Sequence, residues 1–201
     1  MSDTDRPRVT AATAADIDAV TDQWVRLARD QRRHGSTLLA DGNRAAVREW
    51  VAQSVVTGEL LVARGGGSDG SDGADGVAGG AGDSGTVDGD SGTVDGDAGD
   101  AGNDGSEHSL LGFVGFSLER DGYERECTRG TVTNLFVRSD RRGEGIGSAL
   151  LGAAERALAE AGADAVALEA LADNDRARAF YDSRGYDAHR IEFRKEVGDE
   201  E

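Results

Sequence analysis

Residues 65–107 form one continuous tract of glycine and aspartate, and this tract limits what the rest of the chain can fold into. The tract holds 16 glycines, ten aspartates, one glutamate and no lysine or arginine, so its formal charge is −11. Its only bulky apolar residues are three valines, too few to offset the conformational entropy that ordering would cost. We therefore expect one domain, residues 1–201, interrupted by a disordered acidic insert at about 65–107.

A tandem repeat of seven residues lies inside this tract, first at 83–89 and again at 90–96. A calcium-binding β-roll also uses glycine and aspartate, but it needs a nine-residue repeat with a regular apolar position. The repeat therefore favours a loop, with binding of an ion or a partner as the alternative. Lengthening a loop from about five to about 45 residues costs only about 2 kcal/mol, so the fold can survive the insert.

The overall charge of the chain excludes several classes of protein. The formal charge is −17, and outside the tract the chain still holds 28 acids against 22 bases. Such a chain is a poor partner for nucleic acid or an anionic membrane. No apolar run reaches the roughly 18 residues of a membrane span, and the first residues lack the regions of a signal peptide. Cys127 is the only cysteine, which fits a reducing compartment, so we expect a cytoplasmic protein.

The basic residues have an unusual composition, because 21 of the 22 are arginine and only Lys195 is lysine. Acid-rich, lysine-poor chains resemble halophilic proteins, in which salt screens the self-repulsion of the surface.

The pattern of apolar residues predicts a mixed α/β domain. Asp16 is the expected N-cap of a first helix that Gly35 ends, and Gly58 ends a second helix. The continuous apolar run at 165–168 suggests a strand buried on both faces. We expect strands at 9–12, 60–63, 110–118, 131–137 and 165–168, a last strand carrying Ile191 and Phe193, and helices at 16–34, 43–57, 146–161 and 175–183.

The order of these elements predicts a mixed sheet. No helix separates the strands at 60–63 and 110–118, so they are expected to pair as an antiparallel hairpin with the insert as its loop. The strand, helix and strand within 131–168 predict a right-handed parallel crossover.

A glycine-rich turn joins the strand at 131–137 to the helix that begins at Ile146. Glycines at 143, 145 and 147 leave the backbone N–H groups of a helix N-terminus accessible to an anion such as a pyrophosphate. A Walker loop would need a lysine, and a dinucleotide fingerprint would need the spacing G-x-G-x-x-G, which is absent. A plain strand-to-helix turn, with glycine for packing, is a further alternative.

The segment Arg142-Gly143-Glu144-Gly145-Ile146-Gly147 matches the pattern Arg/Gln-x-x-Gly-x-Gly/Ala. Upstream lies Leu135-Phe136-Val137, and downstream lie Asn174, Ala177, Ala179, Phe180, Tyr181 and Gly185-Tyr186. Together these motifs resemble the coenzyme A loop, the fourth strand and the C-terminal signature of the GCN5-related N-acetyltransferases (GNAT). The resemblance extends over nearly all of the chain except the insert. It implies the GNAT acyl-CoA N-acyltransferase fold, with a mostly antiparallel sheet, a splayed parallel strand pair and flanking helices.

The resemblance also implies how acetyl-CoA would bind as cosubstrate, without a metal. The main chain of Leu135, Phe136 and Val137 would contact the pantetheine arm. Asn174 would bind the same arm, although it also reads as a helix cap. The amides of Arg142, Gly143, Glu144, Gly145, Ile146 and Gly147 would hold the pyrophosphate.

Two residues are the catalytic candidates. In the family, the tyrosine at the position of Tyr181 lies beside the departing sulfur, and a phenol can protonate a thiolate. Glu169 precedes Asn174 by five residues, a spacing similar to that of the ribosomal-protein alanine N-acetyltransferases, where the glutamate accepts a proton. The alternative for Glu169 is a solvated carboxylate at a strand end, and Glu119 is a weaker candidate for the base.

The acceptor would then be a primary amine, with a protein N-terminus ahead of a small amine such as a polyamine or an aminoglycoside. A non-catalytic coenzyme-A-binding module, whose acidic loop recruits a basic partner, is the alternative. The sequence leaves a homodimer open. Cys127 lies in a polar segment, and the three histidines lack the spacing of metal ligands.

Overall fold

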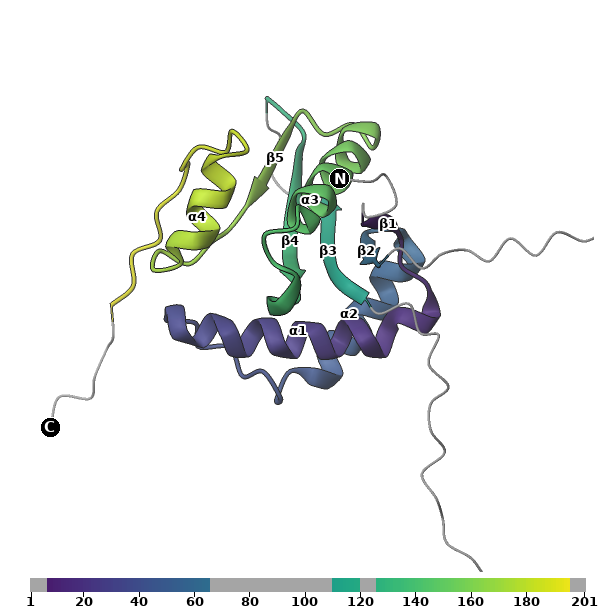
Figure 1. Ribbon diagram of the computed structural model, residues 1–201. Helices are drawn as coiled ribbons and strands as arrows, with labels where there is room; N and C mark the ends of the chain where they lie inside the picture. The colour runs from purple at the N-terminus through teal and green to yellow at the C-terminus, as the bar shows by residue number, and fades with distance from the viewer. Residues whose placement is uncertain (1–6, 66–109, 120–125, 196–201) are drawn as a thin grey trace, which may run out of the picture.

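The computed structural model describes residues 7–65, 110–119 and 126–195, and the insert expected at about 65–107 lies outside them except for Gly65. Figure 1 shows the arrangement of the elements. The strands are β1 (Arg8–Ala11), β2 (Leu60–Arg64), β3 (Leu110–Leu118), β4 (Arg129–Val137) and β5 (Ala165–Leu168), and the helices are α1 (Ile17–Gln31), α2 (Arg44–Thr57), α3 (Ile146–Glu160) and α4 (Asp175–Asp182).

The described strands form one mixed sheet in the order β1-β2-β3-β4-β5. Neighbouring strands pair antiparallel from β1 to β4, whereas β5 runs parallel to β4. The mixed sheet that the sequence predicts is therefore confirmed, including the β2–β3 hairpin pair and the crossover through α3. No helix in the described part of the chain is long and apolar enough to cross a membrane.

Two apolar clusters cover the two faces of the sheet. On one face, α1 and α2 pack around Phe113 and Phe136, and on the other face α3 packs against Val114 and Val132. The second cluster also receives Phe180, Tyr181 and Tyr186 from α4 and the turn after it. Figure 1 shows α1 crossing one end of the sheet and α4 standing beyond β5, at the side of the molecule away from β1.

The first helix has the predicted N-cap residue, but the side chain of that residue has other partners. A 3₁₀ turn at Ala14–Asp16 precedes α1, and the Asp16 carboxylate accepts hydrogen bonds from the N–H and the hydroxyl of Thr13 at 2.7 and 2.9 Å. Arg64 at the end of β2 also donates to both oxygens of this carboxylate, each at 2.8 Å. Asp16 is the N-cap residue of α1, as expected, but its side chain makes no capping hydrogen bond to α1 and binds Thr13 and Arg64 instead.

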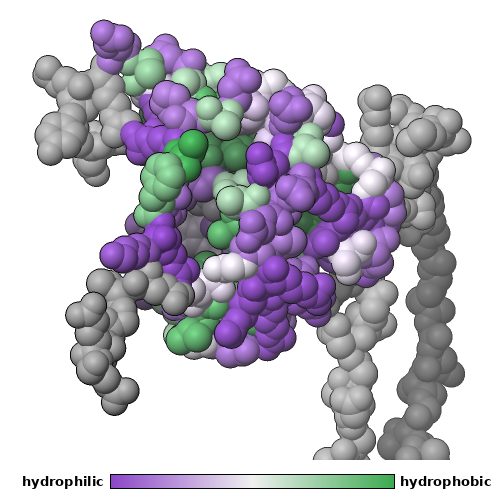
Figure 2. Space-filling model, turned by 90° about the vertical axis from the view of Figure 1, so that its left-hand side faces the viewer, coloured by the Kyte–Doolittle hydropathy of each residue, from purple (hydrophilic) through white to green (hydrophobic). Residues whose placement is uncertain are grey.

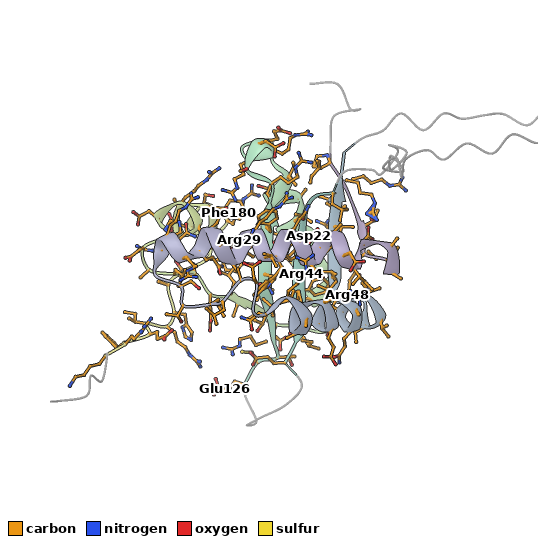
Figure 3. All side chains as sticks on the ribbon, turned by 90° about the horizontal axis from the view of Figure 1, so that it is seen from below. Asp22, Arg29, Arg44, Arg48, Glu126 and Phe180 are labelled. Carbon is orange, nitrogen blue, oxygen red and sulfur yellow. The ribbon has the colours of Figure 1, made fainter. Side chains whose placement is uncertain are left out.

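Arginines of α2 connect this helix to α1 on the molecular surface. Arg44 binds Asp22, and Arg48 binds Asp18 at 2.8 Å between Nε and Oδ1. Figure 3 shows Asp22 on α1 and Arg44 and Arg48 on the neighbouring α2. Exposed pairs of this kind contribute at most about 1 kcal/mol each, so the buried apolar cluster accounts for most of the stability of this layer.

The strand β5 is less buried than its sequence suggests. Ala165 is exposed and the next three residues are only half-buried, so the expected burial on both faces is wrong. The strand lies at the edge of the described sheet, with β4 as its one neighbour.

The last predicted strand does not form. Residues 187–195 have no regular secondary structure, and the side chains of Ile191 and Phe193 are 77% and 90% exposed. Alternating apolar residues give this segment the local pattern of a strand, but no strand of the described sheet pairs with it.

Candidate active site

The strands β4 and β5 part halfway along β4. Their parallel pairing runs from Arg129 opposite Ala165 to Val132 opposite Leu168, and β4 then continues alone to Val137. A β-bulge interrupts the pairing with β3 at the same level, since Phe116 pairs with Val132 and Gly115 with Asn134. The extra residue at this bulge, Thr133, is exposed. The bulge and the end of β5 together open one edge of β4.

The peptide groups on this open edge belong to Leu135 and Val137. The N–H of Arg138 donates to the carbonyl of Leu111 at 2.9 Å, so the peptide group of Arg138 faces β3. Because the peptide groups of successive strand residues point to opposite edges, those of Leu135 and Val137 point away from β3 and that of Phe136 toward it. Phe136 places its side chain in the cluster under α1 and α2.

The glycine-rich turn leads from this open edge into α3. Gly143 and Gly145 have φ of 92° and 81°, which L side chains rarely adopt, and Gly145 is the N-cap of α3. A Cβ built on either glycine would meet no atom within 4 Å. The turn therefore presents an open backbone surface at the positive end of α3, as an anion-binding turn requires.

This geometry predicts different effects for two alanine substitutions in the turn. Gly145→Ala should cost about 1–2 kcal/mol of stability, because alanine disfavours the left-handed region. It should also weaken acetyl-CoA binding about tenfold, since a changed backbone redirects the N–H groups. Urea unfolding and titration calorimetry would measure the two effects.

Gly147→Ala is the matched control. A Cβ at Gly147 would lie 3.6 Å from Val137 and 3.7 Å from Phe180, which is ordinary contact. This residue is already helical, so alanine should raise stability by about 0.5–1 kcal/mol and leave the affinity unchanged. Equal affinities of the two variants for acetyl-CoA would contradict the assignment of the turn.

The arginines of the turn are paired with carboxylates. Arg141 donates from Nε to both oxygens of Glu144 at 2.9 Å, and Arg138 donates to Asp140 at 2.7 Å. These hydrogen bonds hold the pKa of Glu144 and the pKa of Asp140 below their usual values. The positive charge that the sequence places here is therefore largely neutralised, and the backbone is the main feature left to attract an anion.

Arg142 connects the turn to two other elements. Its Nε donates to the carbonyl of Val137 at 3.0 Å, and its guanidinium reaches Asp30 of α1 at 3.3 Å. This side chain therefore lies across the end of β4 and fixes the turn against α1. The role of Asp30 could not be predicted from the sequence, because 112 residues separate the partners.

Asn174 is the N-cap of α4, and its Oδ1 accepts a hydrogen bond from the N–H of Ala177 at 3.1 Å. The helix that follows packs on α3 through its aromatic residues. The hydroxyl of Tyr186 donates to Glu155 at 2.8 Å, and Arg184 binds Ser148 and lies over the ring of Phe180. These contacts hold α4 beside the glycine-rich turn.

Tyr181 lies between two aromatic rings. Its ring centroid is 5.3 Å from that of Phe180 and 6.0 Å from that of Tyr186. Burial raises the pKa of Tyr181 above its ordinary value. Because this pKa is raised, the phenol is protonated at neutral pH. Its hydroxyl has no hydrogen-bond partner among the described residues, so it is available to a bound molecule.

The two candidate bases lie at opposite ends of the β4–β5 pair. Glu169 directly follows β5, is exposed and lies where the strands part. Glu119 accepts hydrogen bonds from Arg129 at 2.8 Å and from the hydroxyl of Thr131 at 3.1 Å, two positions before the bulge residue Thr133. The hydrogen bond to Glu119 raises the pKa of Arg129. Both carboxylates therefore lie near the level where β4 and β5 part, but Glu119 is held by Arg129 and Thr131, whereas Glu169 is exposed.

A further contact joins the segment after α1 to the segment before α4. After α1, a 3₁₀ turn carries His34, whose Nδ1 lies 3.0 Å from the carbonyl of Asp173, immediately before Asn174. Figure 2 shows this side of the molecule hollowed, with both hydrophilic and hydrophobic residues around the hollow. In the described residues, no group of three histidine, cysteine, aspartate or glutamate side chains is placed to hold a metal ion.

Comparison with known proteins agrees with these features. Residues 96–186 match the model of the acetyltransferase (GNAT) family. A putative acetyl transferase from Pyrococcus furiosus is 18% identical, with a TM-score of 0.59 over 96% of this chain and 100% of its own. A GCN5-related N-acetyltransferase from Ralstonia eutropha JMP134 is 16% identical, with a TM-score of 0.58 over 96% of this chain and 99% of its own.

A transcriptional regulator from Bacillus halodurans C-125 shares the same fold at 14% identity, with a TM-score of 0.58 over 96% of this chain and 100% of its own. No curated protein sequence matches the chain. The described residues therefore have the fold of the GNAT acetyltransferases, and residues 96–186 match the model of that family, in agreement with the resemblance of the motifs.

Proposed function

We propose that the protein is an acetyl-CoA-dependent N-acetyltransferase that transfers the acetyl group to a primary amine. The observation that carries this proposal is the open edge of β4, which leads directly into the uncovered backbone of the glycine-rich turn. An extended arm with a charged diphosphate at one end and a thioester at the other fits this shape and polarity. A plain strand-to-helix turn would need neither the bulge nor the parted strands.

Each part of the coenzyme has a group to hold it in this proposal. The outward peptide groups of Leu135 and Val137 bind the pantetheine arm, beside Phe136, and the N–H groups of residues 142–147 bind the diphosphate. The amide nitrogen of Asn174 is available to the arm, because Oδ1 alone caps α4. A backbone N–H directed at the thioester carbonyl stabilises the negative charge that develops on its oxygen.

Transfer is a direct attack of the amine nitrogen on the acetyl carbon. The new C–N bond forms as the C–S bond breaks, and the sulfur leaves as a thiolate that takes the proton of Tyr181. The amine must be neutral to attack, so its extra proton passes to Glu169 through a water molecule. As the amide forms, the nitrogen releases its second proton to solvent. Solvent then returns a proton to the Tyr181 phenolate, so that in net one proton passes from nitrogen to sulfur, and Glu169 releases the ammonium proton to solvent.

The leading acceptor is a protein N-terminus, because the spacing of Glu169, Asn174 and Tyr181 is similar to that of the ribosomal-protein alanine N-acetyltransferases. Polyamines and aminoglycosides are the second acceptor class. The alternative is a coenzyme-A-binding module without turnover, in which Tyr181 and Glu169 would have no kinetic role. Kinetic measurements on variants of these two residues distinguish it from an enzyme. A single cytoplasmic domain interrupted by the acidic insert remains part of the proposal.

Release of free thiol from acetyl-CoA in the presence of an amine panel tests this function. The wild type should release coenzyme A with at least one primary amine, and Glu169→Gln should lower kcat roughly 10²-fold, the usual contribution of a positioned base. Glu160→Gln, which alters an exposed carboxylate at the end of α3, is the control and should change nothing. Unchanged turnover in Glu169→Gln would show that Glu169 is not the base. Absence of thiol release with every amine would favour the binding module.

A further inference from the structure

A cavity of about 250 Å³ lies between α1 and the segment that follows β4. Arg26 and Asp30 of α1 line one side, Phe136 forms part of the wall from β4, and Arg138, Ser139 and Arg142 contribute from the turn. Because Phe136 belongs to the cluster under α1 and α2, the cavity lies on the face of the sheet opposite α3. None of the motifs in the sequence involves Arg26.

The charges around this cavity leave one arginine uncompensated. Asp140 is bound by Arg138, and Asp30 is bound by Arg142. Arg26 is exposed and has no ion-pair partner among the described residues. A chain with a formal charge of −17 thus forms a small cavity with excess positive charge. Carboxylate and phosphate oxygens are the natural partners of such guanidinium groups.

The cavity lies close to the point where β4 and β5 part. Phe136 and Arg138 are three and five positions beyond Thr133, the bulge residue on β4. At the rise of a strand, the cavity is therefore roughly 10–17 Å from the bulge, where the proposed reaction joins amine and thioester. The coenzyme occupies the turn at the start of α3, so the acceptor approaches from the face under α1 and α2.

We propose that this cavity selects acceptors by binding an anionic side chain, with Arg26 as its specificity-determining residue. The inference rests on the proposed function, since it places the acceptor amine at the parted strands. An extended peptide advances about 3.3–3.6 Å per residue, so an Asp or Glu at the third or fourth position of a protein N-terminus reaches this distance. The preferred substrate is an N-terminus with an acidic residue at one of these positions.

Two peptides that differ in one residue test this inference. Both are hexapeptides with N-terminal alanine, one with Glu and one with Gln at the fourth position. Calorimetry measures their binding to the full-length protein saturated with coenzyme A, and thiol release measures KM and kcat with acetyl-CoA. The wild type should bind the Glu peptide about tenfold more tightly and show a correspondingly lower KM, because a hydrogen bond to a charged group is lost in the Gln peptide.

Arg26→Gln should abolish this preference while leaving kcat and the KM for acetyl-CoA unchanged. Arg29→Gln is the matched control, because Arg29 lies on the same helix but pairs with Asp41 at 2.6 Å outside the cavity. Figure 3 shows Arg29 on α1, from the side where α2 lies next to it. The control should keep the preference for the Glu peptide.

Three results would overturn the inference. The first is equal or undetectable binding of the two peptides by the wild type. The second is a preference that persists in Arg26→Gln. The third is a raised KM for acetyl-CoA in Arg26→Gln without a change in peptide preference, which would assign the cavity to a phosphate of the coenzyme. The calorimetric comparison requires no turnover, so failure of the acetyltransferase function alone would appear separately, as absent thiol release.

Discussion

Tyr181→Phe is expected to lower kcat roughly 10²- to 10⁴-fold while the KM for acetyl-CoA stays near its wild-type value. The substitution removes only the hydroxyl proton that we assign to the departing thiolate. The ring contacts with Phe180 and Tyr186 remain, so binding of the coenzyme and folding should persist. Steady-state kinetics of thiol release and calorimetry with acetyl-CoA would measure the two effects separately.

The neighbouring tyrosine supplies a control for this substitution. The hydroxyl of Tyr186 is already bound to Glu155, so Tyr186→Phe should cost about 1 kcal/mol of stability with little change in kcat. If Tyr181→Phe turned over as fast as Tyr186→Phe, the assignment of Tyr181 as the acid would be wrong.

The pH dependence of the wild type follows from the direction of the same pKa. Burial raises the pKa of Tyr181, so the protonated, active form persists to a higher pH than for a free tyrosine. At any pH below about 10, kcat should therefore show no decrease caused by ionisation of Tyr181. A pH–rate profile that falls at neutral pH in the wild type but not in Tyr181→Phe would contradict this direction.

Gly112→Ala is expected to destabilise the fold strongly. A Cβ at Gly112 would lie 2.3 Å from the carbonyl oxygen of Phe136 and 3.2 Å from Leu150. The first of these atoms is backbone, so β3 and β4 would have to move apart. We expect a loss of roughly 3 kcal/mol and a decrease in Tm of about 6–12 °C.

Gly152→Ala is the control for this steric effect. Gly152 lies inside α3, and its added Cβ would meet only the end of the flexible Arg156 side chain, at 3.6 Å. Alanine is a better helix former than glycine, so this variant should gain about 0.5–1 kcal/mol. Thermal unfolding of both variants tests the register of β3 against β4, and similar Tm values for the two would show that this register is wrong.

Local sequence signals predicted most of the fold correctly. Glycines at 35, 58, 162 and 185 mark helix ends, and the structure gives all four a positive φ. The hairpin strands and the parallel crossover also followed from apolar runs and from the order of elements. The N-cap position of the first helix was predicted correctly at Asp16, but the capping box that this residue forms with Thr13 was not, although the two have the required three-residue spacing.

The errors concern features that depend on distant parts of the chain. A run of four apolar residues does not distinguish a central strand from an edge strand, so the exposure of β5 was not predictable. Likewise, the alternation around Ile191 and Phe193 describes a strand but not a partner for it.

In the candidate site, too, residues in short motifs could be predicted from the sequence, whereas residues that only the fold brings together could not. The glycine-rich turn, Asn174 and Tyr181 could be predicted as site residues because each belongs to a short motif, and their roles stay predictions. Arg26 and Asp30 were missed because α1 reaches the turn only in the folded chain. The neutralised charge of the turn could have been suspected from the three-residue spacing of Arg141 and Glu144, but the pairing of Arg142 with Asp30 could not.

Calorimetric titration of the purified protein with acetyl-CoA, together with thermal unfolding, tests the central claim most directly. We expect saturable binding, and an increase in Tm of about 5–11 °C when the coenzyme is present at 100 times its Kd. The absence of both heat and a thermal shift at millimolar acetyl-CoA would contradict the claim that the edge of β4 and the glycine-rich turn form a coenzyme site.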